Sequence, residues 1–174
     1  MIREIKETSR EGWKICNINE TYRVAIPAKM DLDTATEICH KLGRGNITEP
    51  KNERDITLVV SLLQKTNNSC KYVWTPITDE EVEGEFRSSI TSQLATFLPW
   101  EKHQPNGGDA ENHVVILMKS MHWADNSKYK EAFSACDLHK NLVFTLIGVC
   151  KHTYFGKQLF QCNNVWFFLL FSFA

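Results

Sequence analysis

The pattern of apolar and polar residues predicts one strand and then two helices in the N-terminal part of the chain. Residues 22–27 alternate with a period of two, which is typical of a strand with one buried face. In residues 31–43, apolar side chains recur at the spacing of one helix face, Asp33 can cap the first turn and Gly43 can end the helix. A second helix is expected at residues 52–65. Its apolar face consists of Ile56, Val59, Val60, Leu62 and Leu63.

Three apolar runs predict further strands at residues 71–77, 113–118 and 142–150. Residues 79–112 lie between the first two runs and are rich in Asp, Glu, Gly, Ser and Pro. An irregular stretch of this length is unusual in a compact domain, and such loops usually carry function. One strand, two helices, a strand, a long loop and further strands together indicate the α+β class.

The composition of the chain fits a single globular domain. Its 174 residues are 43% hydrophobic and 24% charged, which is sufficient for a packed core. Twenty basic and 21 acidic residues give a net charge of −1. This balance provides no overall attraction for nucleic acids or anionic membranes, so neither is expected as a partner. Residues 1–12 are charged and are expected to be loosely held.

Cysteines and sequons favour an oxidising, extracellular compartment. Six cysteines suffice for two or three disulfides. Three N-x-[ST] sequons begin at Asn19, Asn46 and Asn67. Residues 1–7 nevertheless lack the apolar stretch of a secretory signal. A truncated sequence, or a piece of a larger secreted protein, would reconcile these features.

Residues 165–174 form an apolar run at the C-terminus. A membrane-spanning helix needs about 20 apolar residues, so this run is not expected to insert into a membrane. A strand packed on the core, an incomplete membrane anchor and translated non-coding sequence are the competing explanations. The last is preferred, because the run has no cap or polar flank.

A series of short motifs runs from residue 22 to residue 150 in a characteristic order. The motifs are residues 35–43, 73–79, 83–86, 99–100, 104–108, 111–112 and 123–125. Together they resemble the C-type lectin-like domain. The resemblance implies two helices packed on small antiparallel sheets, with a long irregular ligand-binding loop region. It divides the chain into an N-terminal extension (1–21), the domain (22–151) and a C-terminal extension (152–174).

The resemblance also implies calcium-assisted carbohydrate binding, and hence glycans or glycoproteins as partners. Matching the motifs position by position gives four candidate ligands for both calcium and sugar: Gln104, Asn106, Glu111 and Asp125. Calcium prefers six to eight oxygen ligands, which carboxylates and amide carbonyls supply. Pro105 stands where the family has a cis proline.

Two departures from the family pattern affect this expectation. Ala124 stands where the family usually has an Asn ligand, and its methyl group cannot coordinate calcium. A weakened calcium site is therefore expected, because affinity follows the number and charge of the ligands. Gln104 with Asn106 combines features of mannose-type and galactose-type sites, so the preferred sugar is not defined.

The resemblance implies a long-range disulfide between Cys39 and Cys150. It leaves Cys136 without its usual partner, because His113 stands in that position. Cys16, Cys70 and Cys162 remain as candidates for pairing. We further expect the sequon residues Asn46 and Asn67 to lie on the surface, and His113 to face the core.

The sequence leaves three classes of function open. The first is a sugar-binding lectin domain, and the second is a lectin-like protein-interaction module without calcium or sugar. The third is an enzyme that uses His103, His113, His122 and Cys136. These residues lack metal-type helical spacing, and the chain has no phosphate-binding glycine loop or nucleophile elbow. We therefore expect no catalytic residues and favour the first class.

Overall fold

The computed structural model describes residues 3–5, 14–18, 21–42, 44–64 and 70–139. Its first helix, α1 (Leu32–Lys41), begins at Asp31, whose side chain accepts a hydrogen bond from Thr34 N. Asp33, expected as the cap, instead lies in the first turn. Asp31 is the N-cap residue because its backbone is extended, as that position requires. The second helix, α2 (Glu53–Gln64), buries the five apolar residues predicted for its inner face.

Seven strands follow one another in a mixed sheet, in the order β1-β2-β3-β9-β5-β7-β8. Two short strands pair beside this path, β4 with β9 and β6 with β5. Neighbours are antiparallel except β5 and β9, which run parallel where Val73 pairs with Phe133. The bounds are β1 (Arg3–Ile5), β2 (Lys14–Ile18), β3 (Thr21–Met30), β4 (Asn46–Ile47), β5 (Tyr72–Thr78), β6 (Arg87–Ser88), β7 (His113–Leu117), β8 (Trp123–Asn126) and β9 (Ala132–His139).

The strands predicted at residues 22–27, 71–77 and 113–118 are confirmed as β3, β5 and β7. Residues 1–12 were expected to be loose, but Arg3–Ile5 form β1. The central strand β9 was not predicted. It is buried from residue 132 to residue 136, so it shows no alternation of apolar and polar residues. The strand expected at residues 142–150 lies outside the described residues.

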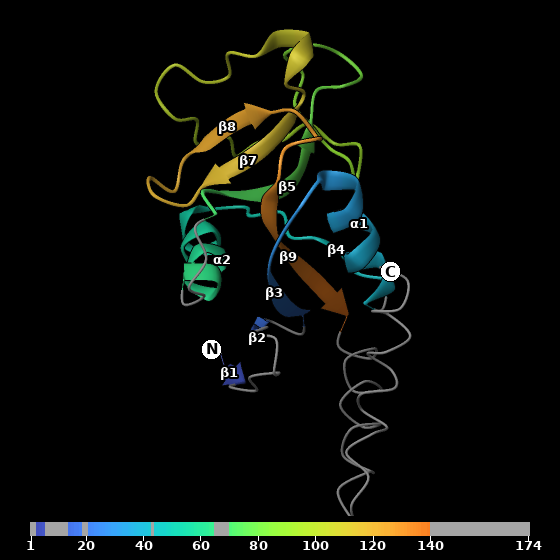
Figure 1. Ribbon diagram of the computed structural model, residues 1–174, viewed down its shortest axis with the longest axis vertical. Coiled ribbons are helices and arrows are strands. Elements are labelled where there is room, and N and C mark those ends of the chain that lie inside the picture. The colour runs from blue at the N-terminus through green and yellow to red at the C-terminus, as the bar shows by residue number, and fades with distance from the viewer. Residues whose placement is uncertain (1–2, 6–13, 19–20, 43, 65–69, 140–174) are drawn as a thin grey trace, which may run out of the picture.

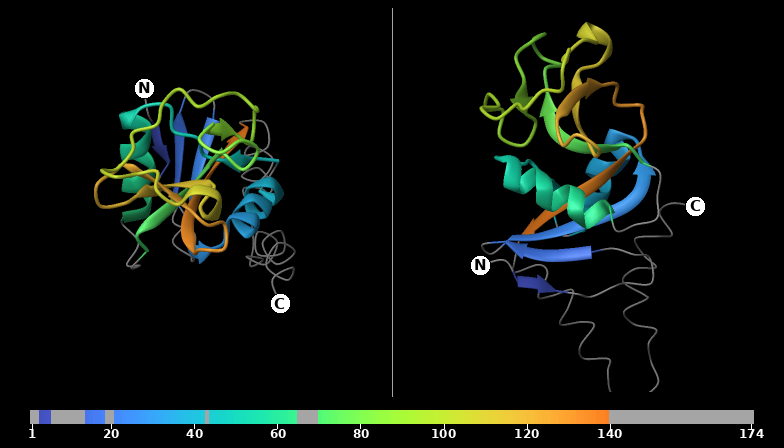
Figure 2. Two further views of the ribbon diagram at one scale, coloured as in Figure 1. Left: turned by 90° about the horizontal axis from the view of Figure 1, so that it is seen from above. Right: turned by 90° about the vertical axis from the view of Figure 1, so that its left-hand side faces the viewer.

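Two hydrophobic clusters fill the space between the sheet and the helices. Val73 of β5 packs in the cluster that contains Ile56 of α2. The next residue, Trp74, packs in the cluster that contains Ala35 of α1. Because successive side chains of a strand point to opposite faces, each helix covers a different face. Figures 1 and 2 accordingly show α1 and α2 on opposite sides of β3 and β9.

A disulfide joins Cys39 of α1 to Cys136 of β9, with an S–S distance of 2.06 Å. The expected Cys39–Cys150 pairing is therefore wrong, and Cys136 does have a partner. The physical reason is that β9 packs against α1, which brings Cys136 next to Cys39. The bridge spans 97 residues. Cys150 itself lies outside the described residues.

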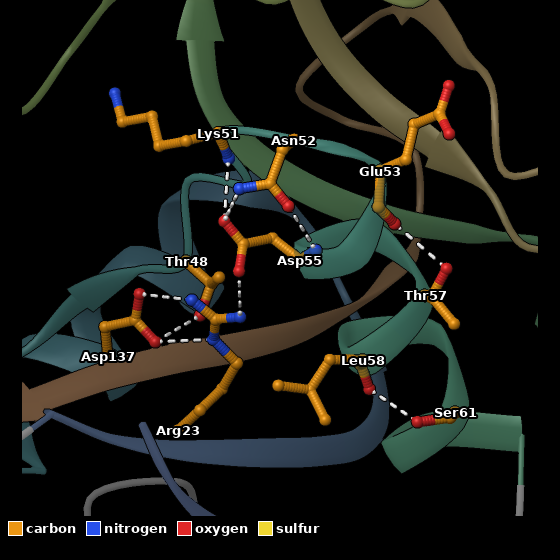
Figure 3. Close-up of polar contacts among 10 residues, drawn as sticks. All are labelled: Arg23, Thr48, Lys51, Asn52, Glu53, Asp55, Thr57, Leu58, Ser61 and Asp137. Carbon is orange, nitrogen blue, oxygen red and sulfur yellow. Dashed lines mark hydrogen bonds and ion pairs between the residues drawn. The ribbon is translucent and has the colours of Figure 1, made fainter. Parts of the chain in front are cut away.

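A partly buried ion pair connects β3 with β9 and reaches α2. Arg23 of β3 donates two hydrogen bonds to the carboxylate of Asp137 of β9, at 2.7 and 3.0 Å. Its Nη1 atom lies 3.8 Å from Asp55 Oδ1 in the first turn of α2 (Figure 3). Thr48 also donates to Asp137 Oδ1, at 2.9 Å. These contacts join β3, β9 and the start of α2.

The predicted long irregular region lies at the opposite end of the domain. Between β5 and β7, regular structure is limited to β6 and a 3-10 turn at Gly108–Ala110. The loops gather above β5, β7 and β8, at the top of Figure 1. Aromatic contacts attach them to the core, since Phe97 packs edge-on against the fully buried Trp123. The core therefore presents the loops on a rigid base.

Candidate functional site

Strand β8 carries Asp125 from the core into the loop region. It pairs with β7, with Val114 opposite Asp125, and the neighbouring Trp123 is fully buried. Asp125 itself is only 5% exposed. A buried carboxylate needs hydrogen-bond donors or a cation as partners, because loss of hydration disfavours its charge.

Asp125 uses one of its two carboxylate oxygens to hold the loop at residues 104–107. Asp125 Oδ2 accepts hydrogen bonds from the backbone N–H groups of Asn106 at 2.9 Å and Gly107 at 2.6 Å. Asp125 Oδ1 is buried without a hydrogen-bond partner. The carboxylate therefore fixes the loop with one oxygen, while the other is available to a ligand.

Gln104 presents a second buried oxygen of the same kind. Its backbone N–H donates to Glu101 O at 3.0 Å, which closes a tight turn, and the Gln104–Pro105 bond is cis, as the resemblance implies. The side-chain carbonyl oxygen, Gln104 Oε1, is buried and has no hydrogen-bond partner. Such an oxygen is costly to leave unsatisfied and is a suitable calcium ligand.

Glu111 lies against the segment that Asp125 holds. Its backbone ends the 3-10 turn by donating to Gly108 O at 2.9 Å. A Cβ atom on Gly107 would lie 2.3 Å from Glu111 Cβ and 2.7 Å from Glu111 Oε2. Only glycine at position 107 allows this approach, and it brings the Glu111 carboxylate next to the loop.

Asn106, the remaining expected ligand, and Ala124, which replaces a usual ligand, do not present buried oxygens. The side chain of Asn106 is exposed, and its contact with Asp125 is made by the backbone. Ala124 is 6% exposed and belongs to the apolar cluster that contains Val115. The structure thus brings Asp125 and Glu111 against residues 106–107, leaves Asn106 at the surface and has a methyl group at position 124.

Acidic residues outside the expected set add negative charge to this end of the domain. Asp79 is 4% exposed; its Oδ2 accepts from Gly84 N at 3.0 Å, and its Oδ1 is buried without a hydrogen-bond partner. The pKa of Glu83 is raised by desolvation and then by the negative charges of Asp79, Asp109 and Asp125. The mutual repulsion of these carboxylates would be relieved by a cation.

Within the part of the chain that the structure describes, no three His, Cys, Asp or Glu side chains are arranged to hold a metal ion. A calcium ion here would therefore depend on amide oxygens as well as on carboxylates. The oxygen of Gln104 fits this requirement, since calcium readily accepts neutral carbonyl ligands.

His113 occupies a buried position, as expected. It is 8% exposed, and its Nε2 atom lies 4.0 Å from Glu80 Oε2. Burial lowers the pKa of His113, and the nearby Glu80 carboxylate opposes that effect. Of the two sequon residues expected at the surface, Asn46 is exposed, and Asn67 lies outside the described residues.

The fold and its loop region are those of a C-type lectin-like domain. The family model described as "Lectin C-type domain" matches residues 28–140. The chain belongs to this family.

Two curated relatives illustrate the match. Collectin-10 of Xenopus tropicalis is 24% identical over 140 residues, which are 80% of this chain and 46% of that protein. Human "C-type lectin domain family 3 member A" is 29% identical over 94 residues, which are 53% of this chain and 47% of that protein. The chain thus spans about half the length of these relatives.

Solved structures share the fold at low sequence identity. Human lithostathine has a TM-score of 0.64 and 15% identity, over 75% of this chain and 90% of its own. The carbohydrate-recognition domain of cow CD23, solved in the presence of a GlcNAc2Man3 oligosaccharide, has a TM-score of 0.60 and 22% identity, over 76% and 96%. Herring type II antifreeze protein has a TM-score of 0.61 and 20% identity, over 75% and 98%.

Among the described residues, no helix is both long and apolar enough to span a membrane.

Proposed function

We propose that this domain binds carbohydrate with the assistance of a weakly held calcium ion. The observation that carries the proposal is the pair of buried, unpartnered oxygens Gln104 Oε1 and Asp125 Oδ1. Each stands at a position where the family resemblance places a calcium ligand. A protein rarely buries such oxygens unless a water, an ion or a ligand satisfies them.

Four residues would hold the ion, with distinct contributions. Asp125 and Glu111 provide negative charge, and Gln104 and Asn106 provide neutral carbonyl oxygens. Calcium, when bound, would offer open coordination positions to neighbouring sugar hydroxyls. The same side chains can hydrogen-bond those hydroxyls, so that ion and sugar are recognised together. Asn106, which is exposed, is accessible to a ligand from solvent.

The affinity for calcium is expected to be low. Ala124 supplies no oxygen, and the site has two carboxylates among its expected ligands. Extracellular calcium modules with modest charge have dissociation constants of about 10⁻⁴–10⁻³ M. We place this site at the weak end of that range.

The same proposal assigns the protein to the extracellular space as a secreted glycoprotein without catalytic activity. The Cys39–Cys136 disulfide supports this location, because such bonds persist in oxidising compartments. Glycans or glycoproteins are then the natural partners. The cow CD23 domain offers one example of this fold in the presence of an oligosaccharide.

A protein-interaction module without calcium or sugar is the second candidate function. Ala124 at a usual ligand position and His113 in place of a half-cystine favour it. The herring antifreeze protein also has this fold, so the fold by itself does not define a sugar-binding protein.

A glycan array probed with the full chain separates the two candidates. We expect the protein to bind glycans at a calcium concentration about 5–10 times 10⁻³ M. This binding should be lost when a chelator is added. Glu111→Gln keeps the shape of the side chain but removes its charge. This variant is compared with the wild type and should bind less glycan. Binding that is absent in calcium, or unaffected by the chelator and by Glu111→Gln, would favour the protein-interaction module.

A further inference from the structure

Asn46 and Thr48 are the first and third residues of one sequon, and they have opposite surroundings. Asn46 of β4 is exposed, whereas Thr48 is 2% exposed. Sequons of this type are acceptors for N-linked glycans in proteins that pass through the secretory pathway. The acceptor side chain thus has room for a glycan, while the hydroxyl group of its own sequon is enclosed.

The Thr48 hydroxyl is enclosed by the ion pair between β3 and β9. It donates to Asp137 Oδ1 at 2.9 Å, the oxygen that also accepts from Arg23 Nε at 2.7 Å. Arg23 in turn reaches Asp55 of α2 at 3.8 Å (Figure 3). Thr48 and Asp137 are 89 residues apart in the sequence, and Arg23 and Asp137 are 114 residues apart. The hydroxyl therefore acquires these partners only when the domain folds.

The backbone of the sequon is fixed in the same way. In the β4–β9 pairing, Asn46 lies opposite Asp137 and Ile47 lies opposite Cys136. The backbone N–H of Thr48 donates to Ala135 O at 2.7 Å. After folding, the sequon is an extended segment held along its length, and it cannot turn to present both its amide and its hydroxyl to an enzyme.

We propose that Asn46 carries an N-linked glycan, which is added before residues 46–48 dock on β9. The donor is a polyprenyl-pyrophosphate-linked oligosaccharide, and Asn46 Nδ2 attacks its anomeric carbon. The bond between that carbon and the pyrophosphate oxygen breaks, the pyrophosphate leaves with the electron pair, and Nδ2 gives up one proton. The transferase reads the hydroxyl at the third position, so the burial of Thr48 sets the order of events. This proposal rests on the secretory route proposed above.

A glycan at Asn46 would leave the candidate calcium site open. Strand β4 lies beside α1 and β9, while the loop region lies at the top of the domain, beyond β5 (Figure 1). The glycan would extend from an exposed side chain and displace none of the contacts of Thr48. It would therefore add a hydrated group near α1 without competing with ligands of the loops.

The site is tested with the full chain behind a cleavable signal sequence, translated in the presence of microsomes. Asn19→Gln with Asn67→Gln leaves Asn46 as the acceptor of the only remaining sequon. We expect this variant to gain one glycan that a peptide N-glycosidase removes, and we expect the further change Asn46→Gln to abolish it. Thr48→Ser should keep the glycan and Thr48→Val should lose it. No glycan on the Asn46-only variant, although its signal sequence is cleaved, would overturn the proposal.

The order of events is tested separately with purified transferase and donor. The unglycosylated full chain is supplied either folded and oxidised or reduced and unfolded. We expect the folded protein to be modified at least about tenfold more slowly, because only a locally opened state presents the sequon. Equal rates would overturn the proposed order. Neither assay depends on calcium or sugar binding, so a failure here is distinct from a failure of the proposed lectin activity.

Discussion

Asp125 Oδ2 lies 2.6 Å from the backbone nitrogen of Gly107, and this hydrogen bond ties β8 to the loop that follows the cis Gln104–Pro105 bond. The same oxygen accepts from Asn106 N, while Asp125 Oδ1 is buried without a hydrogen-bond partner. One oxygen of the carboxylate therefore shapes the loop, while the other is available to a ligand. Pre-positioned ligands of this kind reduce the ordering that binding would otherwise require.

Gly107→Ala should weaken calcium binding by steric displacement of Glu111. Gly107 has a φ of −90°, which alanine tolerates, so the effect comes from the 2.3 Å approach of the new Cβ to Glu111 Cβ. We expect calcium affinity to fall roughly tenfold, about 1.4 kcal/mol, in a calorimetric titration.

Gly108→Ala is the matched control for that substitution. A Cβ atom at Gly108 meets nothing within 4 Å, but its φ of +49° is unfavourable for alanine. Gly108→Ala should therefore lower stability by about 1–2 kcal/mol with a smaller effect on calcium affinity. An equal loss of affinity in both variants would contradict the role assigned to Glu111.

Ala124→Asn should restore an oxygen to the calcium site. We expect calcium affinity to rise by roughly tenfold, about 1.4 kcal/mol, and sugar affinity to rise with it because ion and sugar share ligands. Ala124→Val adds bulk without an oxygen and is the control, since Ala124 is 6% exposed and packs in an apolar cluster. Calorimetry on all three proteins is the measurement. Unchanged affinity in Ala124→Asn, with the fold retained, would show that position 124 does not face the ion.

Removing the disulfide should destabilise the domain strongly. The Cys39–Cys136 bridge spans 97 residues, and the chain-entropy model assigns a loop of about this length 4–5 kcal/mol of the free energy of unfolding. Cys39→Ala with Cys136→Ala should lose about this amount in denaturant unfolding. Peptide mapping without reductant should recover residues 39 and 136 in one linked peptide. A peptide that links Cys39 to Cys150 would contradict the structure.

Burial of His113 should make stability depend on pH. Because desolvation lowers the pKa of folded His113 below its usual value of 6.5, the unfolded chain binds the proton more readily. The contribution of neutral His113 to the free energy of unfolding should therefore be complete above about pH 6.5. The free energy of unfolding should fall as the pH drops below this value, by at most about 1.4 kcal/mol per pH unit. His113→Gln should flatten this part of the profile between pH 7.5 and pH 5, relative to the wild type. Parallel profiles for the two proteins would exclude the effect.

The sequence predicted those elements that show either one periodic apolar face or an apolar run, such as β5 and β7. The helix α2 (Glu53–Gln64) shows its buried face as a clear periodic pattern because its other face is exposed. Strand β9 is buried on both faces and contains Ser134 and Ala135, so it leaves no such pattern. The wrong partner for Cys39 follows from this omission, since the nearby Cys136 could be recognised only once β9 was known.

The resemblance proposes residues for the candidate site, but the sequence does not predict their contacts. Motif order selects Gln104, Asn106, Glu111 and Asp125. It does not reveal that Asp125 holds the loop through backbone N–H groups. Asp79 Oδ2 accepts a hydrogen bond from Gly84 N, while its Oδ1 is buried without a hydrogen-bond partner; this contact lies within a turn that has no periodic signal. Local backbone geometry of this kind must be seen in three dimensions.

The most direct test of the central claim is a calorimetric calcium titration of the full chain, compared with Asp125→Asn. We predict one weak binding event in the wild type, with a dissociation constant near 10⁻³ M, roughly the weak end for extracellular modules. Asp125→Asn, which removes one charge from the site, should weaken it by at least about tenfold. Absence of calcium binding to the wild type at concentrations about tenfold above that value, or equal binding by both proteins, would contradict the proposed calcium-assisted site.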